Sequence, residues 1–294
     1  MSKKTASGIG VGVFQVVGDL SSGDPAVVAK RAEELGFHSY WLPEHTVIPK
    51  GSCDDYPGRP ANTPVPEYLF KMPDPFIGLT RAAAVTKTIK LGTGVCLVPE
   101  RNPLLAAKQI ATLDHYSGGR FLFGIGAGWN EPECTVLGGD FDHRWVQTKE
   151  SIAVMKKLWT GEYVEHHGKY YDFGPLVCLP KPGRNPHPPV LLGSIGSPLV
   201  FKRVVEWGDG WVPVCFDPKE IADGKAELVK YAKAAGRDPD SLEITAFGLD
   251  GFHRTAKELA EIAKAGAKNA VIWLKGEDEK AVLAELEELA AAIF

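Results

Sequence analysis

The stretch that decides the fold is IKLGTGVCLVPERNPLLAAKQIATLDHYSGGRFLFGIGAG, residues 89–128. It begins with an apolar run at 89–99, continues with a helical pattern at 102–119 and ends in a second apolar run at 120–128. Runs as apolar as these are typical of strands buried on both faces, and a helix between two such strands indicates a parallel sheet. The stretch therefore predicts one strand-helix-strand unit of an α/β protein.

The same alternation extends outward in both directions. Towards the N-terminus, strands are predicted at 8–14 and 39–45, and helices at 24–36 and 74–86, each helix opened by Asp followed by Pro. Towards the C-terminus, a helix is predicted near 142–160 and is followed by four further units. The strands of these units are predicted at 189–194, 210–214, 243–248 and 269–275. The helices that follow them are predicted at 197–208, 218–236, 255–266 and 277–294, in the same order.

Eight strands in strict alternation with eight helices close most naturally into a (β/α)₈ TIM barrel. A doubly wound open sheet is the alternative, but the first strand, GIGVGVF at 8–14, lacks the GxGxxG spacing of dinucleotide-binding sheets. Two insertions interrupt the alternation: a Pro- and Gly-rich, lid-like loop at 46–73, and a hairpin with a Pro-rich connection at 161–189. Neither is large enough for a second core, so residues 1–294 are expected to form a single domain.

The composition is ordinary for a globular protein. Of the 294 residues 44% are hydrophobic, and the net charge of −4 argues against a nucleic-acid surface. The first apolar run is broken by glycine and too short for a signal sequence or membrane span, so a cytoplasmic protein with no membrane partner is expected. The five cysteines are scattered without a CxxC pair, which predicts reduced thiols and no metal site.

In a TIM barrel the active site is built where the strands end. Glu44 and His45 end the second predicted strand and would face the barrel mouth, although a purely structural hydrogen bond of His45 to Glu44 or to backbone is the alternative. GTGV at 92–95 and GIGAGWNEPE at 124–133 would let a planar ring approach the backbone, or would simply relieve crowding in the barrel.

A further strand end runs into Gly193, Ser194, Ile195, Gly196 and Ser197, and Pro198 then opens a helix. Free backbone N–H groups and two hydroxyls at the positive end of a helix dipole are typical of a phosphate-binding loop. Simple N-capping of the helix by Ser197 is the alternative.

Over almost its whole length the chain resembles the bacterial luciferase-like flavin and deazaflavin oxidoreductases. The resemblance rests on WLPEH at 41–45, LGTGV at 91–95, residues 102–133, GKYYDF at 168–173 with PKP at 180–182, and GSIGSPLVFKRVVEWGDGWVP at 193–213. It implies a (β/α)₈ barrel with an insertion and a bound flavin or deazaflavin.

The resemblance also implies roles for individual residues. Glu44 and His45 would lie beside the redox ring, and a cis peptide between Gly94 and Val95 would back it. The loop of Gly126, Ala127, Gly128 and Trp129 would line the ring or its side chain, and residues 193–197 would hold the cofactor phosphate. Arg101 and Arg144 occupy family-like positions, where an intersegment salt bridge is an equal alternative.

The expected activity is that of an oxidoreductase using coenzyme F420, with hydride transfer to or from a small organic substrate. His45 would exchange the proton and Glu44 would orient its imidazole or contact the cofactor. An FMN-dependent monooxygenase and a flavin-binding barrel without catalysis are the alternatives, and relatives suggest a homodimer. A metal-dependent hydrolase would need clustered strand-end ligands, whereas His166 and His167 lie in the insertion.

The lid-like loop carries Tyr56, Tyr68 and Phe70. These aromatic side chains would line an apolar substrate pocket or would pin the loop to the barrel.

Overall fold

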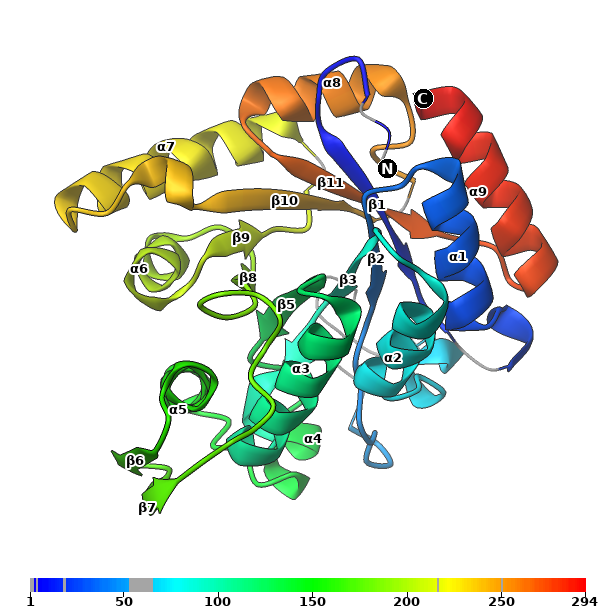
Figure 1. The fold of residues 1–294 in the computed structure, drawn as a ribbon. Coiled ribbons are helices and arrows are strands. Elements are labelled where there is room, and N and C mark those ends of the chain that lie inside the picture. Colours follow the sequence, from blue (N-terminus) through cyan, green and yellow to red (C-terminus); the bar gives the residue numbers. More distant parts are fainter. Residues whose placement is uncertain (1–2, 4, 18–19, 53–65, 216, 250) are drawn as a thin grey trace.

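The chain folds as a closed barrel of parallel strands surrounded by helices, as Figure 1 shows. The computed structural model describes residues 3, 5–17, 20–52, 66–215, 217–249 and 251–294. In ring order the strands are β1 (Gly10–Gln15), β2 (Ser39–Leu42), β3 (Lys90–Thr93), β5 (Phe121–Gly126), β8 (Val190–Gly193), β9 (Gly210–Val212), β10 (Glu243–Gly248) and β11 (Asn269–Leu274). β11 pairs with β1 and β3 pairs with β5, so the ring is closed. The predicted barrel is confirmed, and the open-sheet alternative is wrong.

The helices cover the outside of the barrel, and most of them begin at a capping side chain followed by proline. The side chain of Asp24 accepts a hydrogen bond from the first turn of α1 (Pro25–Leu35), and Asp74 does the same for α2 (Pro75–Val85). The remaining helices of the ring are α3 (Pro103–Ser117), α5 (Arg144–Thr160), α6 (Pro198–Trp207), α7 (Pro218–Ala234), α8 (Ala256–Ala265) and α9 (Glu279–Ile293). A short helix, α4 (Glu131–Val136), follows β5 and is not among the predicted elements.

The third predicted strand, 89–99, is divided. β3 ends at Thr93, the Gly94–Val95 peptide bond is cis, and the strand resumes as β4 (Cys96–Leu97) before a 3₁₀ turn, η3 (Val98–Glu100). The cis bond expected from the family resemblance is therefore present at the predicted position.

Trp41 fills the inside of the barrel. Its side chain is fully buried and packs with Phe14 and Phe247. A Cβ atom added to Gly92 would lie 2.2 Å from the Trp41 ring, and one added to Gly124 would lie 3.2 Å from it. At these two positions glycine relieves crowding, which is the structural alternative raised for the glycine-rich strands.

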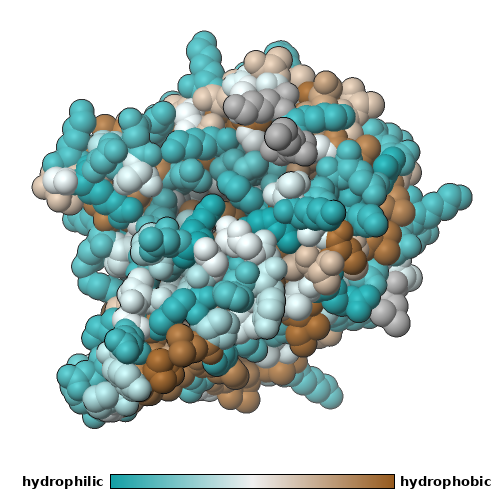
Figure 2. All heavy atoms as spheres, viewed as in Figure 1, coloured by the Kyte–Doolittle hydropathy of each residue, from teal (hydrophilic) through white to brown (hydrophobic). Residues whose placement is uncertain are grey.

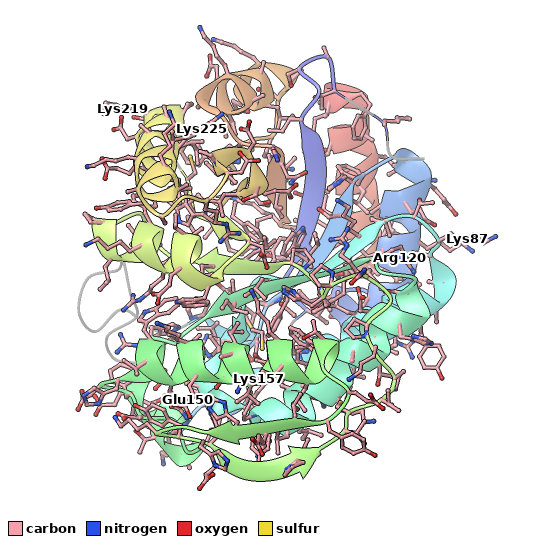
Figure 3. The ribbon with its side chains drawn as sticks, turned by 60° about the vertical axis from the view of Figure 1, so that its left-hand side comes forward. Lys87, Arg120, Glu150, Lys157, Lys219 and Lys225 are labelled. Carbon is pink, nitrogen blue, oxygen red and sulfur yellow. The ribbon has the colours of Figure 1, made fainter. Side chains whose placement is uncertain are left out.

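The two insertions differ in how far the structure describes them. Within 161–189 the expected hairpin is the antiparallel pair β6 (Val164–His167) and β7 (Asp172–Leu176). Glu150 of α5 accepts hydrogen bonds from the backbone of Tyr170 and Tyr171, and Figure 3 shows Glu150 on the side of α5 nearest the hairpin. Of the lid-like loop 46–73, residues 53–65 lie outside the described residues; the described part includes the turn η2 (Glu67–Phe70).

The surface in Figure 2 is largely hydrophilic. No helix in the described ranges is long and apolar enough to cross a membrane. The four cysteines that the structure describes are free thiols. Cys53 and Tyr56 lie outside the described residues.

Candidate active site at the carboxyl ends of the strands

His45 lies just beyond β2 and is held by a carboxylate from another strand-end segment. Its Nδ1 is 2.6 Å from Oε2 of Glu133 on α4, and the two side chains are 8% and 0% exposed. The other carboxylate oxygen of Glu133 accepts the backbone N–H groups of Thr46 and Val47 at 2.8 and 3.2 Å. Because Nδ1 donates to a carboxylate, Nε2 on the far side of the ring is the nitrogen able to exchange a proton.

Glu44 points away from this pair. It is 4% exposed and accepts hydrogen bonds from Leu97 N at 2.7 Å and from the guanidinium of Arg101. Arg101 also donates to Asp74, the N-cap of α2, at 2.7 Å. Glu44 therefore does not hold the imidazole through a hydrogen bond of its own, because its carboxylate is bonded to Leu97 N and Arg101. The alternative, that Glu44 contacts the cofactor, stays a prediction. For Arg101, the intersegment salt bridge is what the structure contains.

The predicted residues on β3, β5 and β8 meet at one rim. A Cβ atom added to Gly126 would lie 2.7 Å from one methyl of Val95, and a Cβ added to Gly193 would lie 2.6 Å from the other. The Val95 side chain thus lies between the carboxyl ends of β5 and β8. Glycine at 126 and 193 leaves the room that Val95 occupies.

The loop after β5 continues from this point towards His45. Gly128 has φ +81°, a left-handed conformation that favours glycine, and its carbonyl accepts Nε of Arg144 at 3.1 Å. Arg144 also donates to Phe141 O at 2.8 Å, so its role here is to fix the loop. Ala127 is buried, and the Trp129 ring packs edge-on against His45 with centroids 5.6 Å apart.

The loop at 193–197 is open to solvent. Ser197 Oγ accepts Val200 N at 3.3 Å and caps α6, as the alternative interpretation expected. Ser194 O accepts the Trp211 indole N–H at 2.9 Å, and Ile195 is 84% exposed. An added Cβ on Gly196 would lie 3.0 Å from Phe201 and Trp211, so this loop packs closely on one side and is free on the other.

His166 and His167 of the insertion hairpin lie apart from this rim. His166 pairs with Glu150 at 3.3 Å, and His167 pairs with Asp172. Within the described ranges no group of three or more His, Cys, Asp or Glu side chains is arranged to hold a metal ion.

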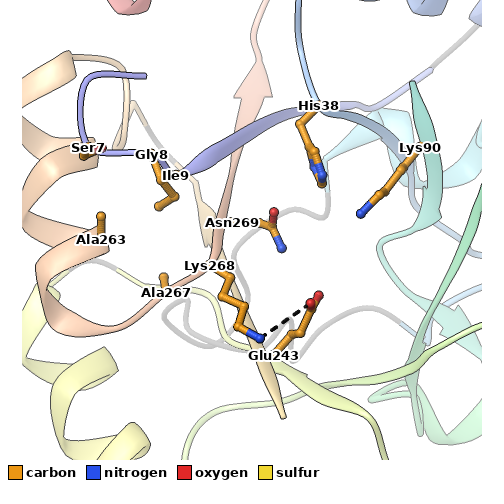
Figure 4. Close-up of a pocket in the computed structure, with 10 residues that line it drawn as sticks. All are labelled: Ser7, Gly8, Ile9, His38, Lys90, Glu243, Ala263, Ala267, Lys268 and Asn269. Carbon is orange, nitrogen blue, oxygen red and sulfur yellow. Dashed lines mark ion pairs between the residues drawn. The ribbon is translucent and has the colours of Figure 1, made fainter. Parts of the chain in front are cut away.

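A cavity of about 440 Å³ lies at the opposite, N-terminal end of the barrel (Figure 4). It is lined mostly by residues that precede or begin strands, among them His38, Lys90 and the Lys268–Glu243 ion pair at 3.8 Å. A second cavity, of about 200 Å³, is lined by Thr46, Asp74, Glu100, Arg101, Asn102, Leu105, Ala106 and Gln109 and adjoins the segment that carries His45.

Comparison with known proteins identifies the family. A model of the luciferase-like monooxygenases matches residues 23–293. The chain belongs to this family. One relative, an uncharacterised protein of Mycobacterium tuberculosis, is 38% identical over 217 residues, 73% of this chain and 75% of the relative. The 5,10-methylenetetrahydromethanopterin reductase of Methanolobus tindarius is 30% identical over 260 residues, 86% of this chain and 71% of the reductase.

Solved structures share the luciferase-like barrel. The monooxygenase RslO1 of Streptomyces bottropensis has a TM-score of 0.75 at 21% identity, covering 97% of this chain and 98% of RslO1. An F420-dependent secondary alcohol dehydrogenase with an F420-acetone adduct has a TM-score of 0.73 at 20% identity, covering 99% of this chain and 100% of the dehydrogenase. An FMN-bound Baeyer–Villiger monooxygenase from Pseudomonas putida has a TM-score of 0.63 at 20% identity, covering 81% of this chain and 66% of the monooxygenase. The luciferase-like oxidoreductases thus include F420-dependent and FMN-dependent proteins.

Glu133 is the site residue that sequence reasoning missed, although it lies in the GIGAGWNEPE stretch. A usable signal is present: Asn130 precedes Glu133 by three residues, and its side chain accepts the Glu133 N–H as the N-cap of α4. An Asn-x-x-Glu start placed directly after a barrel strand puts that carboxylate at the mouth.

Proposed function

We propose that this luciferase-like protein is an F420-dependent oxidoreductase that transfers a hydride to or from a small organic substrate, with His45 as its acid/base. The observation that carries the proposal is the buried Glu133–His45 pair at the strand-end rim, 2.6 Å between Oε2 and Nδ1. Hydride transfer to a carbonyl carbon requires a proton at its oxygen, and the reverse reaction requires removal of that proton. An imidazole with one nitrogen fixed by a carboxylate suits both directions.

The chain's own residues divide this work. Glu133 holds the proton on Nδ1 and fixes the ring plane, while Trp129 packs edge-on against the imidazole. His45 then gives or takes the substrate proton at Nε2. Glu44, tied to Leu97 N and Arg101, fixes the end of β2 against β4 and so positions His45 indirectly.

The rim offers features that suit a deazaflavin. The Gly94–Val95 bulge and the segment of Gly126, Ala127 and Gly128 would support the ring, and the open loop Gly193–Ser197 would hold the phosphate. When bound, F420 supplies hydride donor and acceptor chemistry at a ring carbon. The F420-dependent alcohol dehydrogenase supports this choice. The monooxygenase RslO1 and the FMN-bound monooxygenase support FMN-dependent monooxygenation as the second candidate.

Separate titrations of the protein with F420 and with FMN, followed by absorbance and fluorescence, test the choice of cofactor. We expect saturable binding of F420 at lower concentration than FMN. Tighter binding of FMN would reverse the ranking. A His45→Ala variant that binds F420 and turns over a substrate at the full rate would remove His45 from the mechanism.

A further inference from the structure

Glu100 is a buried carboxyl group that the proposed mechanism does not use. It ends η3 and is 5% exposed, and neither of its side-chain oxygens has a hydrogen-bond partner among the described residues. A charged carboxylate buried without hydrogen bonds is strongly disfavoured, so such a group keeps its proton. Buried and unpartnered polar groups of this kind are rare in folded proteins and are often functional.

Glu100 lies next to the candidate active site. A Cβ atom added to Gly128 would be 2.9 Å from its Oε1, so the carboxyl group faces the loop that leads from β5 to Glu133. η3 itself packs against α4, the helix of Glu133, and against α5. Glu100 also lines the cavity of about 200 Å³ together with Thr46 and Arg101.

The charges around Glu100 are mostly negative. Glu133 faces it from α4 and Glu44 from the end of β2, while Arg101 is the opposing cation. Burial, followed by Glu133 and Glu44, raises the pKa of Glu100 to about 9. Cys134 on α4 is a buried thiol whose pKa is raised to about 11 by burial and then by Glu100.

The charged side chains on the adjoining half of α5 have other partners. Arg144 binds the Gly128 and Phe141 carbonyls, Lys149 pairs with Glu206, and Glu150 pairs with His166. Among the described residues, Glu133 both lies near Glu100 and is bonded to His45.

We propose that Glu100 is a positioning acid of the active site: a protonated carboxyl group that acts on His45 through Glu133. While Glu100 is neutral, Glu133 is the carboxylate bonded to the imidazole. When Glu100 ionises at alkaline pH, the second negative charge increases the proton affinity of the Glu133–His45 pair. The catalytic consequence rests on the proposed function, but the electrostatic coupling between Glu100 and His45 does not.

Imidazole NMR tests the coupling without cofactor or turnover. Protein labelled with ¹⁵N-histidine is titrated from pH 5 to 10.5, and His45→Asn identifies the His45 signals. In the wild type we expect the His45 signals to show a second inflection near pH 9, set by the Glu100 pKa of about 9. Glu100→Gln should lose this inflection and keep the first. Glu131→Gln changes an exposed carboxyl group on α4, the helix of Glu133. It is the matched control and should behave as wild type.

A second inflection that persists in Glu100→Gln, or its absence from the wild type, would overturn the proposal. If Glu100→Gln does not fold, wild-type protein labelled with ¹³C at the glutamate carboxyl decides the point. One glutamate titrating above pH 7 is expected, and titration of every glutamate below pH 6 contradicts it.

The two proposals fail separately. If the protein prefers FMN, or turns over nothing, the NMR result still decides the role of Glu100. If His45-dependent F420 turnover is found while the second inflection is missing, the proposed function stands and Glu100 is structural. Where turnover is measurable, its pH profile should contain an inflection near pH 9 in wild type that Glu100→Gln lacks.

Discussion

β2 carries a histidine at each end, and the two have opposite surroundings. His38 precedes the strand at the N-terminal end of the barrel, where Nδ1 has no partner within the described ranges, and burial together with Lys90 lowers its pKa to about 4. His45 follows the strand at the C-terminal rim and donates to the buried carboxylate of Glu133. The difference teaches what makes a histidine suited to proton exchange. His45 has a carboxylate that comes from another strand end, whereas His38 is merely buried.

The largest effect is expected on turnover, when each histidine is replaced separately by a residue that cannot titrate. His45→Asn should lower turnover about 10²- to 10⁴-fold, the usual contribution of a general acid/base. His38→Asn should change it less than about twofold, because distant sites without shared partners act independently. Steady-state kinetics of both variants, compared at equal folded fraction, test the contrast, and similar losses in the two would refute it.

The next largest effect is expected on stability, from replacing a carboxylate at each end of the barrel. Glu133→Gln should lower the free energy of unfolding by about 1–3 kcal/mol, since a fully buried charged acceptor of three hydrogen bonds is replaced. Glu243→Gln, whose partner Lys268 is 3.8 Å away and half exposed, should cost less than about 1 kcal/mol. Urea unfolding measures both, and equal losses would mean that the buried pair is not special.

Packing at the rim gives a third comparison, between a glycine that has a close neighbour and one that has none. Gly126→Ala would place a methyl 2.7 Å from Val95 and should cost about 1–3 kcal/mol of stability. Gly174→Ala in β7 has nothing within 4 Å and should change stability by less than about 0.5 kcal/mol. Thermal unfolding of the pair checks this, and an unperturbed Gly126→Ala would show that Val95 moves aside freely.

The smallest expected effect is the pH dependence of His38. Its folded-state pKa is about 4, below the ordinary 6.5, so the unfolded chain binds more protons between these values and stability falls as pH drops from 6.5 to 4. Between pH 6.5 and 5.5, His38→Gln should flatten this fall by about 1 kcal/mol. Buried His253 has a pKa lowered to about 4 as well, so part of the fall should remain in the variant. Unfolding midpoints measured across this pH range would contradict the account if wild type and variant ran in parallel.

Much of the fold follows from local signals in the sequence. Asp24 and Asp74 before prolines open α1 and α2, and Ser197 before Pro198 opens α6. The six-residue α4 was missed because it is too short to establish a helical period. The division of the third strand was expected from the family resemblance and not from its residues, since an uninterrupted apolar run carries no mark of a bend.

The positions of several candidate site residues follow from the strand ends, whereas their roles in binding and catalysis stay predictions. His45, Val95, Gly126 and Gly193 do converge at one rim, as their strand-end positions indicate. The partner of His45 could not be chosen from the sequence, because adjacency favours Glu44 whereas Glu44 is bonded to Arg101 in the folded chain. Contacts such as that of His45 with Glu133, 88 residues apart, depend on the closed barrel.

The central claim is that Nε2 of His45, held by Glu133, exchanges the substrate proton while F420 exchanges the hydride. Its most direct test is reduction of F420 by a panel of secondary alcohols, followed by loss of the oxidised coenzyme's absorbance, in wild type and His45→Asn matched for F420 binding. The account predicts turnover in the wild type and a loss of about 10²-fold or more in the variant with F420 affinity retained. Equal turnover by the two proteins would contradict it.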